Sequence, residues 1–228
     1  MPERFAEDVA SISALAERVR RELYLYVIAQ DGPVGREQAA RAVGLPVHSA
    51  KFHLDRLVAE GLLDTEFRRL TARRGPGAGR PAKLYRRSSR EVSVTLPERR
   101  YDLAGAILAD AVERASRERG SLDKAVQRAA TEAGHRSAAG LPRRGRQSAR
   151  AARALARQGY EPRDRDGDVV LANCPFDVLA RDHTELVCSM NRSFVGGMLD
   201  GLGCDHLEAR LDPQPGLCCV RVAAASGP

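Results

Sequence analysis

The sequence predicts an α+β protein with an N-terminal helical domain carrying a β-hairpin, central helices and a small C-terminal α+β domain. Apolar residues recur at helical spacing through most of the chain, and short runs bounded by turn residues suit strands. All five cysteines lie after residue 173 of the 228 residues. These shifts in character predict domains over 1–92 and 159–228, with a helical linker or dimerisation region over 93–158 between them.

The N-terminal segment has the element order of a winged helix-turn-helix. A helical apolar stripe covers 11–30, and helices over Arg36–Val43 and Val47–Glu60 are joined by the turn Gly44-Leu45-Pro46. Two helices linked by a short glycine-containing turn are typical of a helix-turn-helix. Strands over 62–67 and 82–85, with a basic loop between them, would form the wing.

The charge is uneven along the chain. Residues 1–100 carry 19 basic and 13 acidic side chains, and residues 101–158 carry 12 and 6, so each segment has a net charge of +6. Residues 159–228 carry 6 basic and 11 acidic side chains, a net charge of −5. A polyanion would therefore bind the first two segments rather than the last.

Double-stranded DNA is the polyanion that this pattern favours. The helix over 47–60 would enter the major groove, and the wing would hold phosphates or enter the minor groove. The alternative is that these residues are only solvated charges, but the basic run stands at wing distance from a helix-turn-helix. The predicted DNA contacts are Ser49, Lys51, His53, Arg56, Arg73, Arg74, Arg80 and Lys83.

The apolar spacing of the central segment predicts helices over 101–119, 121–139 and about 147–158. A regulator that reads two half-sites is a dimer, and the helix over 101–119 is the candidate dimer element. Ordinary packing inside the domain is the alternative role for this helix.

The C-terminal segment combines short strands, near 169–171, 207–211 and 217–223, with a long helix over 184–202. Cys174 precedes a proline and is expected to be the N-cap of a short helix, which would lower the pKa of its thiol. Cys218 and Cys219 are expected on one strand with their side chains on opposite faces, so that one of the two can ligate easily.

The cysteine spacing predicts a site assembled from separate elements. Intervals of 13, 15 and 13 residues separate Cys174, Cys188, Cys204 and Cys218, and no C-x2-C pair occurs. Three or four thiolates gathered in this way suit zinc or an iron–sulfur cluster. Each thiol could instead be a small buried hydrophobe, and His183 could replace a thiolate or serve only as a surface or capping residue.

Several classes of protein are disfavoured. The chain has no apolar run of the length that crosses a membrane and begins without an apolar signal segment, so we expect a cytoplasmic protein without membrane contact. No G-x-S-x-G, H-E-x-x-H or Walker pattern occurs, and we expect no enzyme activity.

Taken together, the motifs resemble those of the SufR-like regulators, which are bacterial winged-helix repressors of iron–sulfur cluster assembly operons related to the ArsR and DeoR groups. The resemblance rests on the wing segment 79–85, the segment Asn173-Cys174-Pro175-Phe176, the segment 183–188 and the final Cys218-Cys219. It implies a homodimeric repressor and redox sensor whose DNA affinity follows an iron–sulfur cluster in the C-terminal domain.

The same resemblance implies that Cys174, Cys188 and Cys218 are ligands of that cluster, with Cys204 as the fourth and Cys219 or His183 as alternatives to it. Two other interpretations stay open. The same ligands could bind zinc or another metal ion without sulfide, or the cysteines could be buried in a regulator that responds to a small organic molecule.

Overall fold

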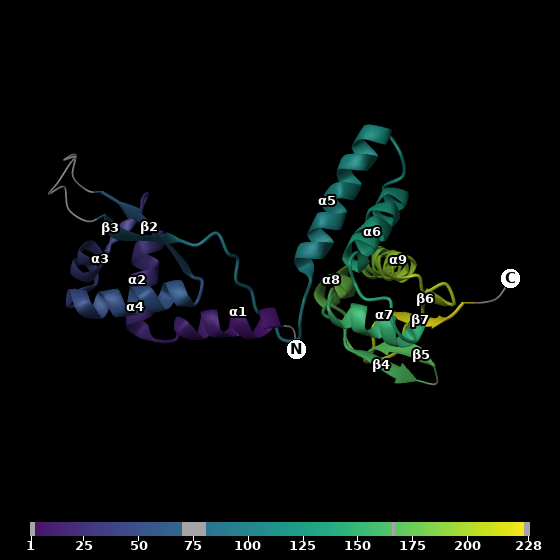
Figure 1. Ribbon diagram of the computed structural model, residues 1–228. Helices are drawn as coiled ribbons and strands as arrows, with labels where there is room; N and C mark the ends of the chain where they lie inside the picture. Colours follow the sequence, from purple (N-terminus) through teal and green to yellow (C-terminus); the bar gives the residue numbers. More distant parts are fainter. Residues whose placement is uncertain (1–2, 70–80, 166, 226–228) are drawn as a thin grey trace. The chain divides into compact units, whose positions relative to one another are not determined.

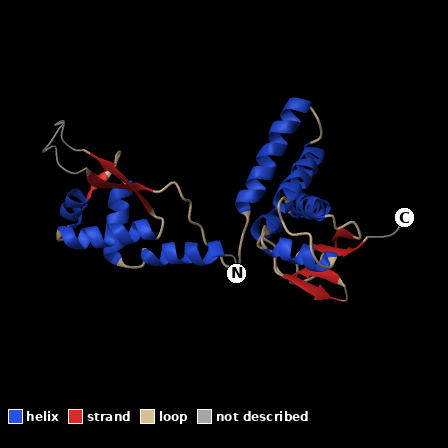
Figure 2. Ribbon diagram, viewed as in Figure 1, coloured by secondary structure: helices blue, strands red, loops and turns tan. Residues whose placement is uncertain are grey.

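The computed structural model describes residues 3–69, 81–165 and 167–225. The chain divides into two compact units, Met1–Val94 and Thr95–Pro228, and each is described by itself. Each unit combines helices with one small antiparallel sheet, so the expected α+β class is confirmed (Figure 2). Within the described residues no helix has the length and apolar character that crossing a membrane requires.

In its described residues, the first unit has four helices and a three-stranded sheet of order β1-β3-β2, packed around one core. In the sheet, β2 pairs with β3 from Leu63 opposite Arg87 to Arg68 opposite Ala82. Its elements are α1 (Glu3–Ala14), α2 (Arg18–Ile28), β1 (Val34–Gly35), α3 (Arg36–Val43), α4 (Val47–Ala59), β2 (Leu63–Arg68) and β3 (Ala82–Arg87).

The helix expected over 11–30 is wrong as a single element, because the chain breaks between α1 and α2. The Glu17 side chain accepts hydrogen bonds from the backbone N–H groups of Val19 and Arg20, at 2.9 and 2.8 Å, and so caps the start of α2. Arg20 in turn donates to the carbonyl of Ala14 at the end of α1. Side chains therefore satisfy the polar groups that a break in a helix exposes.

The turn between α3 and α4 follows the sequence prediction. Gly44 has a φ of +69°, a left-handed conformation that costs glycine little, and Leu45 N–H donates to the carbonyl of Ala40. The second helix, α4, then buries Ala50, Leu54 and Leu57 on one face.

The second unit contains five helices and a four-stranded sheet of order β4-β5-β7-β6 among the residues described. Both α7 and α9 contact the sheet. Its elements are α5 (Tyr101–Glu118), α6 (Leu122–Ala138), α7 (Gln147–Ala156), β4 (Pro162–Arg165), β5 (Asp168–Leu171), α8 (Asp177–Asp182), α9 (Thr184–Leu202), β6 (Leu207–Leu211) and β7 (Val220–Ala224).

One core runs through this whole unit. It joins Ala104 and Ile107 of α5 to Ala130 of α6, Phe194 of α9 and Val222 of β7. Most of the segment 93–158, expected as a region of its own, therefore shares a core with the cysteine-containing segment. Figure 1 shows α5 beside α6 and α6 against α9.

The contact between α6 and α9 depends on glycine. A Cβ atom added to Gly134 would lie 2.2 Å from the carbonyl oxygen of Phe194, and one added to Gly197 would lie 2.1 Å from that of Thr131. Such distances are far inside van der Waals contact, so the backbones of the two helices approach directly at these positions.

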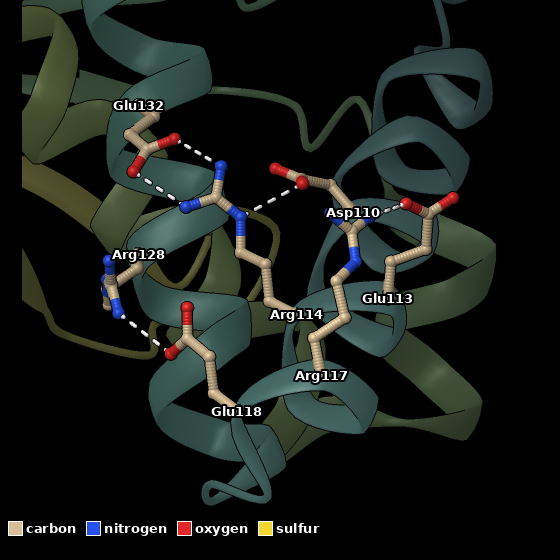
Figure 3. A network of polar contacts seen from close by, with 7 residues as sticks. All are labelled: Asp110, Glu113, Arg114, Arg117, Glu118, Arg128 and Glu132. Carbon is tan, nitrogen blue, oxygen red and sulfur yellow. Dashed lines mark hydrogen bonds and ion pairs between the residues drawn. The ribbon is translucent and has the colours of Figure 1, made fainter.

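Ion pairs join α5 to α6 on the outside (Figure 3). Arg114 donates to both carboxylate oxygens of Glu132, at 2.9 and 2.5 Å, and to Asp110 at 2.9 Å. Arg128 pairs with Glu118 near the end of α5. Partly exposed pairs of this kind contribute little stability each, and the two-point contact of Arg114 with Glu132 mainly fixes the register of the two helices.

Candidate functional site

The exposed face of α4 is the first candidate site. Ala50, Leu54 and Leu57 point into the core, so the helix presents its other side to solvent. The exposed residues on that side include cations and an aromatic ring, and Phe52 is 66% exposed. This exposed set, which we call the α4 face, consists of Val47, His48, Lys51, Phe52 and Arg56.

Asp55 connects the α4 face to the hairpin. Its carboxylate accepts hydrogen bonds from Lys83 Nζ at 2.6 Å and from the Tyr85 hydroxyl at 2.8 Å, and Lys51 Nζ lies 3.3 Å away. Burial acts to raise the pKa of Asp55, but the hydrogen bonds from Lys83, Tyr85 and Lys51 outweigh it and hold this pKa below its ordinary value. Burial and the Asp55 charge raise the pKa of Tyr85. The charged Asp55 of α4 thus stabilises the packing of β3 against this helix.

The predicted contact residues on α4 differ in how available they are. Lys51 is exposed beside Asp55, and Arg56 is exposed with its guanidinium 2.5 Å from Glu60. Ser49 is half-buried. The His53 side chain is only 20% exposed and lies 3.7 Å from Glu17, so it faces α2.

On the hairpin, Lys83 is half-buried against Asp55, where it supports the packing of the hairpin against α4. Arg73, Arg74 and Arg80 lie outside the described residues. The exposed ring of Phe52 was not among the predicted contacts. Its place off the apolar stripe of Ala50, Leu54 and Leu57 is the signal that identifies it as a surface residue.

The second candidate site is a group of thiols in the second unit. Cys174 and Cys218 lie close enough that each shifts the pKa of the other, and Cys219 likewise raises the pKa of Cys188. Cys174 also interacts electrostatically with Cys188, and Cys218 with Cys219. We call these four residues the thiol site.

Three segments bring the thiol site together. Cys174 follows β5, Cys188 lies on α9, and Cys218 and Cys219 immediately precede β7. The pairing of β5 with β7 places the first and last of these segments side by side, and Cys218 N–H donates to the carbonyl of Leu171 at 2.9 Å.

The thiols of the site differ in pKa. The hydrogen bond to Cys218 and burial raise the pKa of Cys174, whereas burial and the hydrogen bond to Cys219 raise the pKa of Cys188 to about 12. The pKa of Cys218 is lowered instead, chiefly because Cys174 donates to it, with further hydrogen bonds from Val220 N–H and Asn191. Negative charge is therefore better stabilised on Cys218 than on Cys174 or Cys188.

Two expectations about these cysteines are wrong. The N-cap of α8 is Phe176, so Cys174 stands before the cap; its thiol faces Cys218 and its pKa is raised. Strand β7 begins at Val220 and the chain bends at Cys219, so Cys218 and Cys219 do not alternate along a strand. Cys218 consequently lies near Cys174, and Cys219 lies near Cys188.

Cys204 lies in different surroundings. Its sulfur is 3.6 Å from Arg150 Nη2 and 3.7 Å from the carbonyl oxygen of Gln147, both on α7. In the part of the chain that the structure describes, these contacts link Cys204 to α7 and none links it to another cysteine. His183 is exposed at the junction of α8 and α9. Among the proposed fourth ligands, Cys219 is the one that the fold brings to the other thiols.

The thiol site suits a metal by the type of its donor atoms rather than by their arrangement in this structure. Over the described ranges, no three His, Cys, Asp or Glu side chains form a group arranged to hold a metal ion. The four thiols instead form two pairs, Cys174 with Cys218 and Cys188 with Cys219, within which one thiol affects the pKa of the other. Four soft sulfur donors from three segments nevertheless match the ligands that zinc and iron–sulfur clusters take, once the thiols are deprotonated.

Comparison with known proteins adds no relative: no protein-family model, curated protein or solved structure matches this chain. The resemblance to the SufR-like regulators therefore stays a prediction that rests on the motifs.

Proposed function

We propose that the chain is a transcriptional regulator that binds operator DNA through a winged helix-turn-helix and acts as a repressor. The observation that carries the proposal is the order α3, three-residue turn, α4 and β2–β3 hairpin, with a basic and exposed face on α4. In a helix-turn-helix the second helix lies in the major groove and the hairpin contacts the flanking backbone.

The α4 face supplies both kinds of contact that DNA recognition requires. Lys51 and Arg56 are exposed cations that can bind phosphates or base edges, and Phe52 offers an apolar surface to a thymine methyl group. Asp55 keeps the hairpin at a fixed position beside this helix, so the two elements would meet the duplex together.

A homodimer is part of the proposal. Helix α5 buries Ala104, Ile107 and Ala111 and exposes small or apolar residues, Ala109 and Val112 among them, on its other side. This exposed side is the proposed contact between two copies. A two-fold dimer predicts a palindromic operator.

The experiment is selection of bound sequences from a library of random duplexes with the full chain, followed by titrations of the selected duplex at several salt concentrations. We expect a palindromic motif. Lys51→Ala should weaken binding and reduce the salt slope by about one. The control Arg163→Ala removes the same charge from exposed β4 and should leave both quantities unchanged. Absence of any selected motif would overturn the proposal.

We further propose that an iron–sulfur cluster held by Cys174, Cys188, Cys218 and Cys219 sets the DNA affinity, in control of cluster assembly or redox genes. When bound, such a cluster supplies a group that responds to oxygen and to redox state. The chain contributes four sulfurs from α9, from the segment after β5 and from the segment before β7, so that ligation would link these three segments.

A zinc-responsive regulator is the second candidate, because four thiolates are also the ligands of a tetrahedral zinc site. Anaerobic purification with a visible spectrum and assays of iron, acid-labile sulfide and zinc separates the two. Brown protein with iron and sulfide supports the cluster, and colourless protein with stoichiometric zinc supports the metal sensor. Protein without metal after reconstitution with iron and sulfide overturns the cluster and leaves a regulator of a small molecule.

A further inference from the structure

A chain of buried hydrogen bonds ends on one sulfur of the thiol site. The Tyr160 hydroxyl donates to Asn191 Oδ1 at 2.5 Å, and Asn191 Nδ2 lies 3.3 Å from Cys218 Sγ and donates to it. Tyr160 is 3% exposed and Asn191 is 1% exposed.

The direction of this chain follows from the orientation of the Asn191 amide in the structure. A carboxamide oxygen can only accept, so the Tyr160 hydroxyl must be the donor to Asn191 Oδ1. That contact leaves the amide NH2 of Asn191 facing the sulfur, which accepts. Both steps therefore orient hydrogen atoms towards Cys218, and the Tyr160 hydroxyl bonds the amide oxygen on the side away from the sulfur.

Packing alone gives no reason for an asparagine at this position. Its neighbours in the core include the apolar residues Met190, Phe194 and Val195, and burying an amide costs free energy unless it is hydrogen-bonded. Among the described residues of the second unit, Asn191 is the buried side chain that carries an amide or a charge. It follows Cys188 by three residues on α9, which places it on the same side of the helix as that thiol.

We propose that Asn191, oriented by Tyr160, is a positioning residue of the thiol site: it fixes Cys218 Sγ and keeps an N–H···S hydrogen bond to that sulfur when a metal binds. The inference rests on the proposed metal-binding role of the thiols. Hydrogen bonds to ligating atoms orient the ligand and tune the metal. An N–H donor also withdraws electron density from the sulfur, and so alters the energy of sulfur-to-metal charge transfer.

The test uses Co2+ alone as the probe, added to the full chain under anaerobic, reducing conditions. Two variants remove the hydrogen bonds in steps. Tyr160→Phe releases the amide, and the double variant Tyr160→Phe/Asn191→Leu replaces both polar groups with apolar ones, so that no buried group is left without a partner. The control is Ser193→Ala, which removes a hydroxyl that donates within α9, to the carbonyl of Ser189.

We expect the double variant to bind Co2+ about 10- to 100-fold more weakly than the unaltered chain, the range usual for such supporting residues. Its charge-transfer band should move to lower energy, and Tyr160→Phe should give a smaller change of both kinds. Circular dichroism establishes that each variant is folded. A folded double variant with unaltered affinity and band energy would overturn the inference while leaving the metal site in place. If the unaltered chain binds no Co2+ through its thiols, the metal site and the inference both fail.

Discussion

At the scale of single residues, Asp55 has the largest part in shaping the α4 face. It accepts from Lys83 and Tyr85 of β3 and pairs with Lys51 of its own helix. Loss of its charge would leave the buried Tyr85 hydroxyl with a weaker acceptor and two lysines without their carboxylate. Asp55 therefore contributes both to stability and to the position of the hairpin.

We expect Asp55→Asn to destabilise the first unit by about 1 kcal/mol at neutral pH, a value reduced because the carboxylate is about one-third exposed. The pKa of Asp55 is lower in the folded protein, so its stabilisation is present above the ordinary pKa of 3.8 and is lost as pH falls through the folded value. The variant should lack this loss. Hydrogen exchange of the α4 and β3 peptides between pH 2 and 7 measures it, with Asp64→Asn on β2 as the control.

The sequence identifies a functional residue when one helix or strand alone determines its position. It does not when the position depends on segments far apart in the chain. Helical spacing identifies the buried side of α4, and therefore the exposed Lys51 and Arg56, since both follow from one helix. The partner of each cysteine depends instead on the pairing of β5 with β7 and on a bend at Cys219. Neither feature has a periodic signal, so spacing favoured Cys204 where the fold brings Cys219 to the other thiols.

At the scale of elements, the close approach of α6 and α9 organises the second unit. Helix α9 also carries Cys188 and Asn191, so its packing against α6 determines where these residues of the thiol site lie. Gly197 lies where a side chain would meet the backbone of Thr131, whereas a Cβ at the adjacent Gly196 would meet nothing within 4 Å.

Substitution of these neighbours should therefore have opposite effects. Gly197→Ala forces the helices apart and should lower the free energy of unfolding by about 1–3 kcal/mol or more. Gly196→Ala adds helix propensity in open space and should leave stability unchanged or raise it by up to about 1 kcal/mol. Urea unfolding followed by circular dichroism compares the two, and equal effects would show that the close approach is not what matters.

Long periodic elements were predictable and short ones were not. Helix α9 and strand β6 have the bounds that the sequence indicates. Strand β1 has two residues and β4 is mostly polar, so each is defined by its partner in the sheet rather than by its own pattern. The break between α1 and α2 likewise depends on one side chain, Glu17, that caps a helix in the middle of an apolar stripe.

At the scale of the whole molecule, the proposed function requires that two separate units affect one another. The DNA-binding residues belong to Met1–Val94 and the thiol site to Thr95–Pro228. A cofactor at the thiol site can change DNA affinity only if its binding differs between the DNA-bound and free states. Couplings in allosteric proteins are about 1–3 kcal/mol, which corresponds to a 5- to 150-fold change in affinity.

Two cysteine variants test this coupling. Cys219→Ser removes a member of the thiol site and should abolish most of the difference in operator affinity between protein with and without its cofactor. Cys204→Ser makes the same change at a buried thiol that contacts α7, and should retain the difference in operator affinity. Because coupling is reciprocal, the operator should change the metal affinity of the unaltered chain by the same factor, and that of Cys219→Ser hardly at all. Fluorescence anisotropy of the operator and competition with a chelator measure the two sides. Loss of coupling in Cys204→Ser but not in Cys219→Ser would place the sensing site at α7 instead of at the thiols beside β7.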